Sequence, residues 1–171
     1  MRASSLLRSR LARSAALAVL AALGFTTAGW SFVSISSTAT PSFSVLLNGA
    51  DQTPTYLLPF TVSSNNSYNG WHVNASATQF VNGTFTFPTG ASRVLAVALP
   101  SGCHFNCLSQ TGSIVYPVAL PETGGVSIFS AASNNADGTN TLTATVQVAT
   151  PANVHTGVYT STVTLQAVSG P

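Results

Sequence analysis

The sequence predicts an all-β protein: an antiparallel, immunoglobulin-like β-sandwich of about eight or nine strands that follows an N-terminal signal peptide. Three observations lead to this prediction. After residue 28, apolar and polar residues alternate over short runs, turn-forming residues separate these runs, and no window shows a helical period. Thr, Ser, Asn and Val dominate the composition, as is typical of strands and turns, and the length suits one domain.

The first 28 residues have the features of an export signal. A start with four arginines precedes an apolar run over residues 15–25 that is too short for a stable bilayer anchor. Small residues lead up to Ala28, so we expect cleavage after it; an uncleaved N-terminal anchor is the alternative. Residues 29–41 are then an extended Ser/Thr-rich leader or a first edge strand, and residues 42–171 form a single domain.

Removal of the signal changes the charge of the protein. Arg93 remains against Asp51, Glu122 and Asp137, which gives a formal charge of −2. A chain with one arginine and no lysine cannot neutralise a row of phosphates, which argues against nucleic acid and anionic membranes as partners. We expect an exported protein of the cell wall, the cell surface or the medium, without a membrane span in its mature form.

Alternating runs define the first strands. Residues 42–47 alternate and end at an Asn-Gly turn. Residues 55–62 alternate again, and Pro59 lacks an N–H donor, so this strand is expected at an edge or with a local bulge. A loop of Asn, Ser and Gly leads to residues 71–77, which alternate from a tryptophan onward. Together, residues 55–80 predict a β-hairpin.

The second half of the chain continues the pattern in shorter runs separated by Gly, Pro and Asn. We expect the last two runs to pair as a terminal hairpin. The predicted strands are 84–87, 93–99, 113–120, 126–131, 140–149 and 157–168.

Three features coincide with the export signal: an alternating strand before an Asn/Gly loop, the segment GWHV at 70–73, and the segment GVYTSTVTL at 157–165. Together they resemble the WxL-type surface domains of Gram-positive bacteria over roughly residues 42–171. The resemblance implies non-covalent attachment to the cell wall through peptidoglycan. The first motif carries Val73 where that family has Leu, and Leu165 stands where its second Trp would fall.

Trp71 and Val73 are the first candidate wall-contact residues, together with Asn65, Asn66 and Tyr68 of the preceding loop. An indole face can stack on a sugar ring of a wall polymer. The alternative is a core tryptophan packed between two sheets, since indoles bury a large area.

Cys103 and Cys107 are the only cysteines, and export leads into an oxidising compartment. They predict a disulfide that closes a tight loop. The short loop makes the entropic gain small, so the bond would mainly fix the shape of the loop. A metal site that includes His104 is the alternative, but the spacing matches no familiar zinc motif.

Two further segments have a possible chemical meaning. Residues 120–124 read LPETG, a sortase recognition sequence, but no apolar segment and basic tail follow, so we interpret them as a turn. Residues 133–140 are rich in oxygen ligands but hold one carboxylate, Asp137, which favours a hairpin tip over a calcium site. Carboxylates and histidines are scattered and no catalytic motif occurs, so we predict no catalytic residues, no metal and no cofactor.

The leading hypothesis is therefore a non-enzymatic, exported surface protein that associates with the cell wall. A second hypothesis is a structural, pilus-like subunit that assembles by strand addition, with residues 29–41 completing the sheet of a neighbour, and that therefore self-associates. A third is a secreted glycan-binding or adhesion module.

Overall fold

The computed structural model describes residues 32–65, 69–99, 108–133 and 137–170. The chain divides into two units, Met1–Trp30 and Ser31–Pro171, and every described residue belongs to the second. No helix that is long and apolar enough to cross a membrane occurs among the described residues.

The described residues form ten strands and no helix, which confirms the all-β class. All strand pairs are antiparallel, and three strands have only two residues each. The strands are β1 (Val33–Ser36), β2 (Thr55–Ser64), β3 (Trp71–Ala77), β4 (Val81–Asn82), β5 (Phe85–Thr86), β6 (Ser92–Ala98), β7 (Val118–Ala119), β8 (Val126–Ala131), β9 (Gly138–Val148) and β10 (Val163–Ser169).

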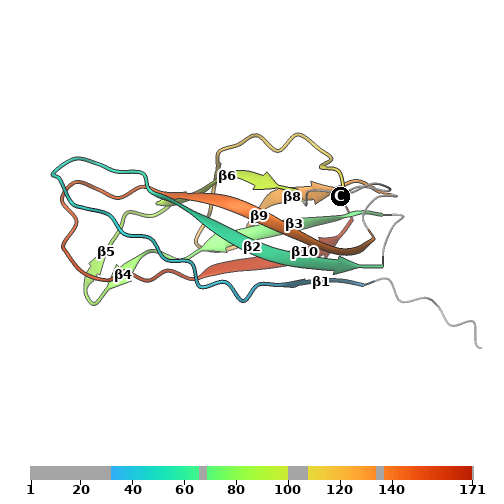
Figure 1. Ribbon diagram of the computed structural model, residues 1–171, viewed down its shortest axis with the longest axis horizontal. Coiled ribbons are helices and arrows are strands. Elements are labelled where there is room, and N and C mark those ends of the chain that lie inside the picture. Colours follow the sequence, from blue (N-terminus) through green and yellow to red (C-terminus); the bar gives the residue numbers. More distant parts are fainter. Residues whose placement is uncertain (1–31, 66–68, 100–107, 134–136, 171) are drawn as a thin grey trace, which may run out of the picture. The chain divides into compact units, whose positions relative to one another are not determined.

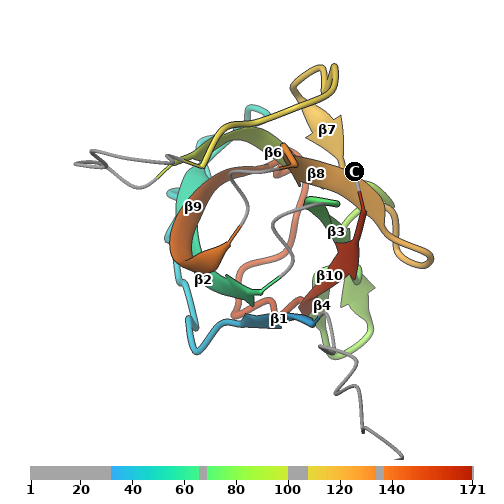
Figure 2. The same ribbon diagram turned by 90° about the vertical axis from the view of Figure 1, so that its right-hand side faces the viewer.

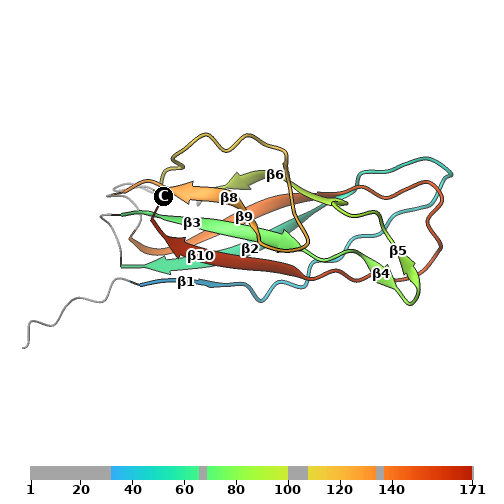
Figure 3. The same cartoon turned by 180° about the vertical axis from the view of Figure 1, so that it is seen from behind.

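Two sheets enclose the main core (Figure 1), and a second, smaller apolar cluster forms around Phe80 and Phe87. The larger sheet has the order β1-β2-β9-β6-β7, and the smaller has the order β10-β3-β8. Figure 3 shows the molecule from behind, with the smaller sheet toward the viewer. Strands β4 and β5 form a separate two-stranded hairpin. In the end-on view, β1 lies beside β10, although the two strands do not pair (Figure 2).

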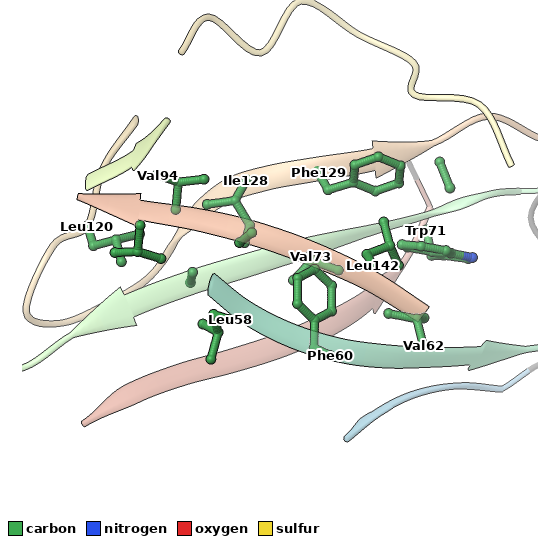
Figure 4. Close-up of a cluster of buried hydrophobic side chains, with 14 of the residues drawn as sticks. Leu58, Phe60, Val62, Trp71, Val73, Val94, Leu120, Ile128, Phe129 and Leu142 are labelled. Carbon is green, nitrogen blue, oxygen red and sulfur yellow. The ribbon is translucent and has the colours of Figure 1, made fainter. Parts of the chain in front are cut away.

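The core follows from the two-residue alternation. Along β3, every second residue is buried and the residues between them are half-buried. Side chains from both sheets meet in this core, among them Phe60 from β2, Trp71 from β3, Phe129 from β8 and Leu142 from β9 (Figure 4). Burial of this apolar surface is the main favourable contribution to the stability of the fold.

The predicted hairpin over residues 55–80 is wrong. Strand β2 pairs with β1 and β9, whereas β3 pairs with β10 and β8, so the two strands lie in opposite sheets. Their inward residues face each other across the core instead of lying side by side in one sheet. The alternation specifies which face of a strand is buried, but it carries no information about the partner strand.

The predicted terminal hairpin is wrong for the same reason. Strand β9 lies between β2 and β6 in the larger sheet, and β10 pairs with β3 in the smaller one. Both strands exist near their predicted positions, and β8 coincides with the predicted residues 126–131.

Several predicted runs form shorter strands than expected. Residues 42–47 have no strand partner, only Val118–Ala119 of the run 113–120 pair as a strand, and the last strand begins at Val163 instead of residue 157. The leader, in contrast, contributes β1, which pairs with the end of β2.

Pro59 lies where this pairing stops. The β1–β2 ladder ends at the pair Ser36 and Thr61, so on that side β2 is an edge from Pro59 backward. The Ser37 hydroxyl donates a hydrogen bond to the Pro59 carbonyl at 2.8 Å. The expectation of an edge position at Pro59 is therefore met on one side of the strand, while β9 pairs with the other side.

Candidate functional site

Trp71 and Val73 lie in the core. Both have 0% of their surface exposed, and the Trp71 ring packs at 5.6 Å from the ring of Phe129. An enclosed indole offers no face to a sugar ring. The structure therefore corrects the expectation that these two residues contact a wall polymer, because β3 turns them toward the opposing sheet.

Of the loop candidates, only Asn65 is among the described residues, and it is exposed. Its side-chain oxygen accepts a hydrogen bond from the Phe32 N–H at 2.7 Å, and its own N–H donates to the Phe32 carbonyl at 3.3 Å. Asn65 thus holds the start of β1 against the end of β2. Asn66 and Tyr68 lie outside the described residues.

The predicted disulfide between Cys103 and Cys107, and its metal-site alternative, also lie outside the described residues. In the part of the chain that the structure describes, no three His, Cys, Asp or Glu side chains come together as metal ligands. His72 bonds through Nδ1 to the Gly170 carbonyl at 2.7 Å, and His155 stacks on Phe85 at 3.8 Å between ring centroids.

The LPETG segment is integrated into the fold. The Leu120 side chain is only 2% exposed, its N–H donates to the Ser92 carbonyl, and the Pro121 carbonyl accepts from the Ala77 N–H at 2.9 Å. These contacts agree with its interpretation as a turn that joins the two sheets.

A groove of the described residues lies at one side of the sandwich, and we call it the seam. Residues 35–37 and 39–47 line one bank, and residues 154–165 line the other. Its volume is about 1190 Å³, and Tyr56, Phe80 and Phe87 contribute to its floor.

Both banks of the seam have backbone groups without strand partners. Residues 38–47 make no backbone-to-backbone hydrogen bond with another described residue. On the other bank, Thr160 exchanges two hydrogen bonds with Val81, at 2.9 and 3.0 Å. In an antiparallel arrangement neighbouring residues point their N–H and C=O groups to opposite sides, so those of Tyr159 and Ser161 point away from Val81, toward the seam. Strand β10 is likewise an edge strand.

Aromatic side chains form the floor at one end of the seam. Phe43 stacks on Tyr56 with centroids 5.8 Å apart and meets Phe80 edge-on at 6.1 Å. Phe87 continues the row, 5.3 Å from Phe80 and 4.7 Å from Tyr159. These five residues form the aromatic floor. Burial raises the pKa of the Tyr56 hydroxyl group above its ordinary value.

Two hydroxyl groups at this end have unmet hydrogen-bonding capacity. The Thr150 and Tyr159 hydroxyl oxygens are buried, and neither has a hydrogen-bond partner among the described residues. Both residues line the seam. Buried polar groups are normally paired, so these two oxygens mark a place where a polar partner would be favourable.

Each bank of the seam has one large exposed apolar residue among several exposed Ser and Thr residues. Leu46 is 86% exposed and Val158 is 82% exposed, one on each bank. No Asp, Glu, Lys or Arg is among the residues that line the seam. Exposed apolar residues that flank a groove are typical of binding surfaces.

The sequence did not predict the seam. The available signal was the alternation of residues 42–47 and of the run 157–168. The structure leaves residues 42–47 and the first part of this run outside any ladder, apart from an isolated bridge at Thr160. The aromatic floor and the two hydroxyl groups come from distant parts of the chain, so no motif could indicate them. Comparison of the chain with models of known protein families and with characterised proteins finds no match.

Proposed function

We propose that this chain is an exported, non-enzymatic surface protein with an immunoglobulin-like sandwich that serves as a structural subunit by taking up an extended strand in its seam. One observation carries the proposal: residues 42–47 on one bank, and Tyr159 and Ser161 on the other, line one groove and make no backbone-to-backbone hydrogen bond with another described residue. The export signal and the lack of charge support the surface location.

Strand addition would give hydrogen-bond partners to backbone groups on both banks at once. An inserted strand has N–H and C=O groups on both edges, so it can pair with each bank, as in other cases of strand addition. Each such hydrogen bond is worth about 0.5–1.5 kcal/mol net. Side chains on one face of the inserted strand would cover the aromatic floor and add hydrophobic stabilisation.

The outer face of the larger sheet supports a structural role. Hydroxyl groups pair across its strands, with Thr61 and Thr141 at 3.1 Å and Ser63 and Thr139 at 3.0 Å. The hydroxyl groups of this face can hydrogen-bond with water, so the face needs no charged residues to be hydrated. The carboxylates and histidines are scattered along the sequence and do not support a catalytic proposal.

Cell-surface extracts provide the test. We expect the protein in high-mass assemblies in size-exclusion chromatography with light scattering, and we expect Leu46→Asp and Val158→Asp to reduce these assemblies. Leu57→Asp is the matched control, because Leu57 is 62% exposed but lies outside the seam. A purely monomeric protein, or assemblies that tolerate both rim charges, would contradict the proposal.

Association with peptidoglycan, implied by the WxL resemblance, is a second proposal that needs another surface than Trp71. The exposed pair Phe85 and His155 favours it, because Phe85 is 43% exposed and offers an aromatic group to solvent. The test is sedimentation of the processed protein with purified peptidoglycan, with Phe85→Ala as the variant. A protein that stays in the supernatant excludes this role.

A further inference from the structure

We infer that the seam selects an uncharged extended segment of a partner chain, which places one large apolar side chain on the aromatic floor and hydrogen-bonds the hydroxyl groups of Thr150 and Tyr159. This inference rests on the proposed function and specifies the chemistry of the strand. It follows from four features of the seam. They are the half-buried rings of the aromatic floor, the two buried hydroxyl groups, the absence of Asp, Glu, Lys and Arg from the lining, and the backbone groups without strand partners on the two banks.

The aromatic floor favours one large apolar side chain. Its five rings come from four separate stretches of chain, yet the members remain unequally covered: Phe80 and Phe87 are 7% and 5% exposed, while Phe43, Tyr56 and Tyr159 are half-buried. A side chain that covers the three half-buried rings removes apolar surface from water without displacing any strand.

The two hydroxyl groups require a polar atom beside that side chain. Thr150 is 4% exposed, and its N–H and C=O are already used in hydrogen bonds with Gln52 at 2.8 and 2.9 Å. Its hydroxyl group therefore is the part of Thr150 that a bound segment can still satisfy. Tyr159 also lines the seam, and its hydroxyl oxygen is buried without a partner among the described residues. A peptide backbone offers a donor and an acceptor at every residue, so it suits both oxygens.

The lining of the seam selects against charge. With no Asp, Glu, Lys or Arg among the lining residues, a charged side chain that entered would lose hydration without gaining a partner. The bound segment should therefore carry uncharged residues at inward positions.

Both banks carry backbone groups without strand partners, and this favours an isolated strand over other occupants. The folded edge of a second copy would offer free backbone groups on one side only and could pair with one bank. A small amphiphilic molecule could satisfy the hydroxyl groups and cover the aromatic floor, but it would leave both banks unpaired. Only an extended segment meets all four conditions.

The experiment uses the processed protein and a fluorescent synthetic peptide of about ten residues that alternates Val with Ser and has one central Phe. Fluorescence anisotropy measures its affinity. We expect the Phe peptide to bind at least tenfold more tightly than the same peptide with Lys at that position, since an unpaired buried charge is strongly disfavoured. Hydrogen exchange should show new protection at residues 157–164.

Two Tyr→Phe variants separate binding from stability. Tyr159→Phe removes an unpartnered hydroxyl group, so we expect unchanged or higher stability but roughly threefold to tenfold weaker peptide binding. Tyr116→Phe is the matched control outside the seam. Its hydroxyl group donates to the Ile128 carbonyl at 2.6 Å, so this variant should lose stability and retain the peptide affinity.

The inference is overturned by equal binding of the Phe and Lys peptides, by Tyr159→Phe with full affinity, or by peptide binding without protection on the banks. If no peptide binds while rim-dependent assemblies persist in the extracts, this inference fails and the proposed function stands. If the assemblies are also missing, both fail.

Discussion

Strands β3 and β10 lie side by side in the same sheet, yet their inward residues have different environments. The inward residues of β3, from Trp71 to Ala77, are 0–4% exposed. The inward residues of β10, which include Val163 and Leu165, are only half-buried. The two strands pair residue by residue from Val163 and Ala77 to Ser169 and Trp71, so sequence pattern and backbone geometry are alike. The difference comes from what covers them.

The larger sheet completes the core only on one side. Strands β2 and β9 supply Phe60, Val62 and Leu142 to the cluster that encloses β3. On the side away from β3, β10 has as neighbours the four-residue strand β1 and residues 37–47, which form no strand, with the seam between the banks. A sandwich thus buries its inward residues completely only where both sheets extend over them, and its uncovered side is available for binding.

The largest expected effect tests the closed side. Trp71→Ala should lower the free energy of unfolding by about 3–5 kcal/mol, because the lost side chain leaves a cavity between packed sheets. Urea denaturation measures the loss. Trp71→Phe, which keeps a ring near Phe129, is the control and should lose less. A loss below about 1 kcal/mol for Trp71→Ala would contradict the described packing.

A matched pair of leucines compares the two sides directly. Leu142→Ala on β9 should cost about 3 kcal/mol, whereas Leu165→Ala on β10 should cost about 1 kcal/mol, since a half-exposed site loses less burial and can rearrange. The same denaturation experiment measures both. Equal losses would mean that the seam is closed in solution and that the comparison fails.

Glycines offer a smaller test of close packing. Gly70, before β3, has φ +67°, and a Cβ there would collide with the Ala131 carbonyl oxygen. Gly49, after residues 42–47, has φ +79° and open space around it. Gly49→Ala should cost about 1 kcal/mol from the left-handed backbone alone, and Gly70→Ala roughly 2 kcal/mol or more. Thermal unfolding distinguishes them, and equal costs would argue against the close contact at Gly70.

The smallest effect is on the alkaline side of the pH profile. Burial raises the pKa of Tyr56 above the unfolded value of 10.0. Above that value the unfolded chain loses this proton before the folded chain does, so stability is full below pH 10.0 and falls as the pH rises toward the folded pKa. Tyr56→Phe should flatten this decline in alkaline denaturation.

A bound peptide should raise the Tyr56 pKa further, because the aromatic floor becomes more deeply buried. Tyr116 is the internal reference. Burial also raises its pKa, against a smaller lowering by the Gln110 side chain, and it lies outside the seam. Tyrosinate absorbance with and without peptide measures the change. An unchanged Tyr56 titration would show that the peptide does not cover the floor.

The local pattern alone predicted much of the fold. Residues 126–131 were expected as a strand and form β8, and the alternation from Trp71 to Ala77 correctly indicated which side of β3 is buried. This was possible because a strand turns successive side chains to opposite faces whatever its neighbours are. The candidate site could not be predicted in this way, since Thr150 and Phe43 become neighbours of the same groove only in the folded chain.

The amino-acid sequence by itself determined the all-β class, the positions of most strands and the buried faces of β2, β3 and β9. Only the tertiary structure decided which strands pair, that Trp71 is enclosed, and that residues 38–47 and Tyr159 lie at a groove without backbone-to-backbone hydrogen bonds to other described residues. The physical reason is that strands pair through backbone N–H and C=O groups, and every residue except proline has both. Pairing therefore depends on how the whole chain distributes its apolar faces between two sheets.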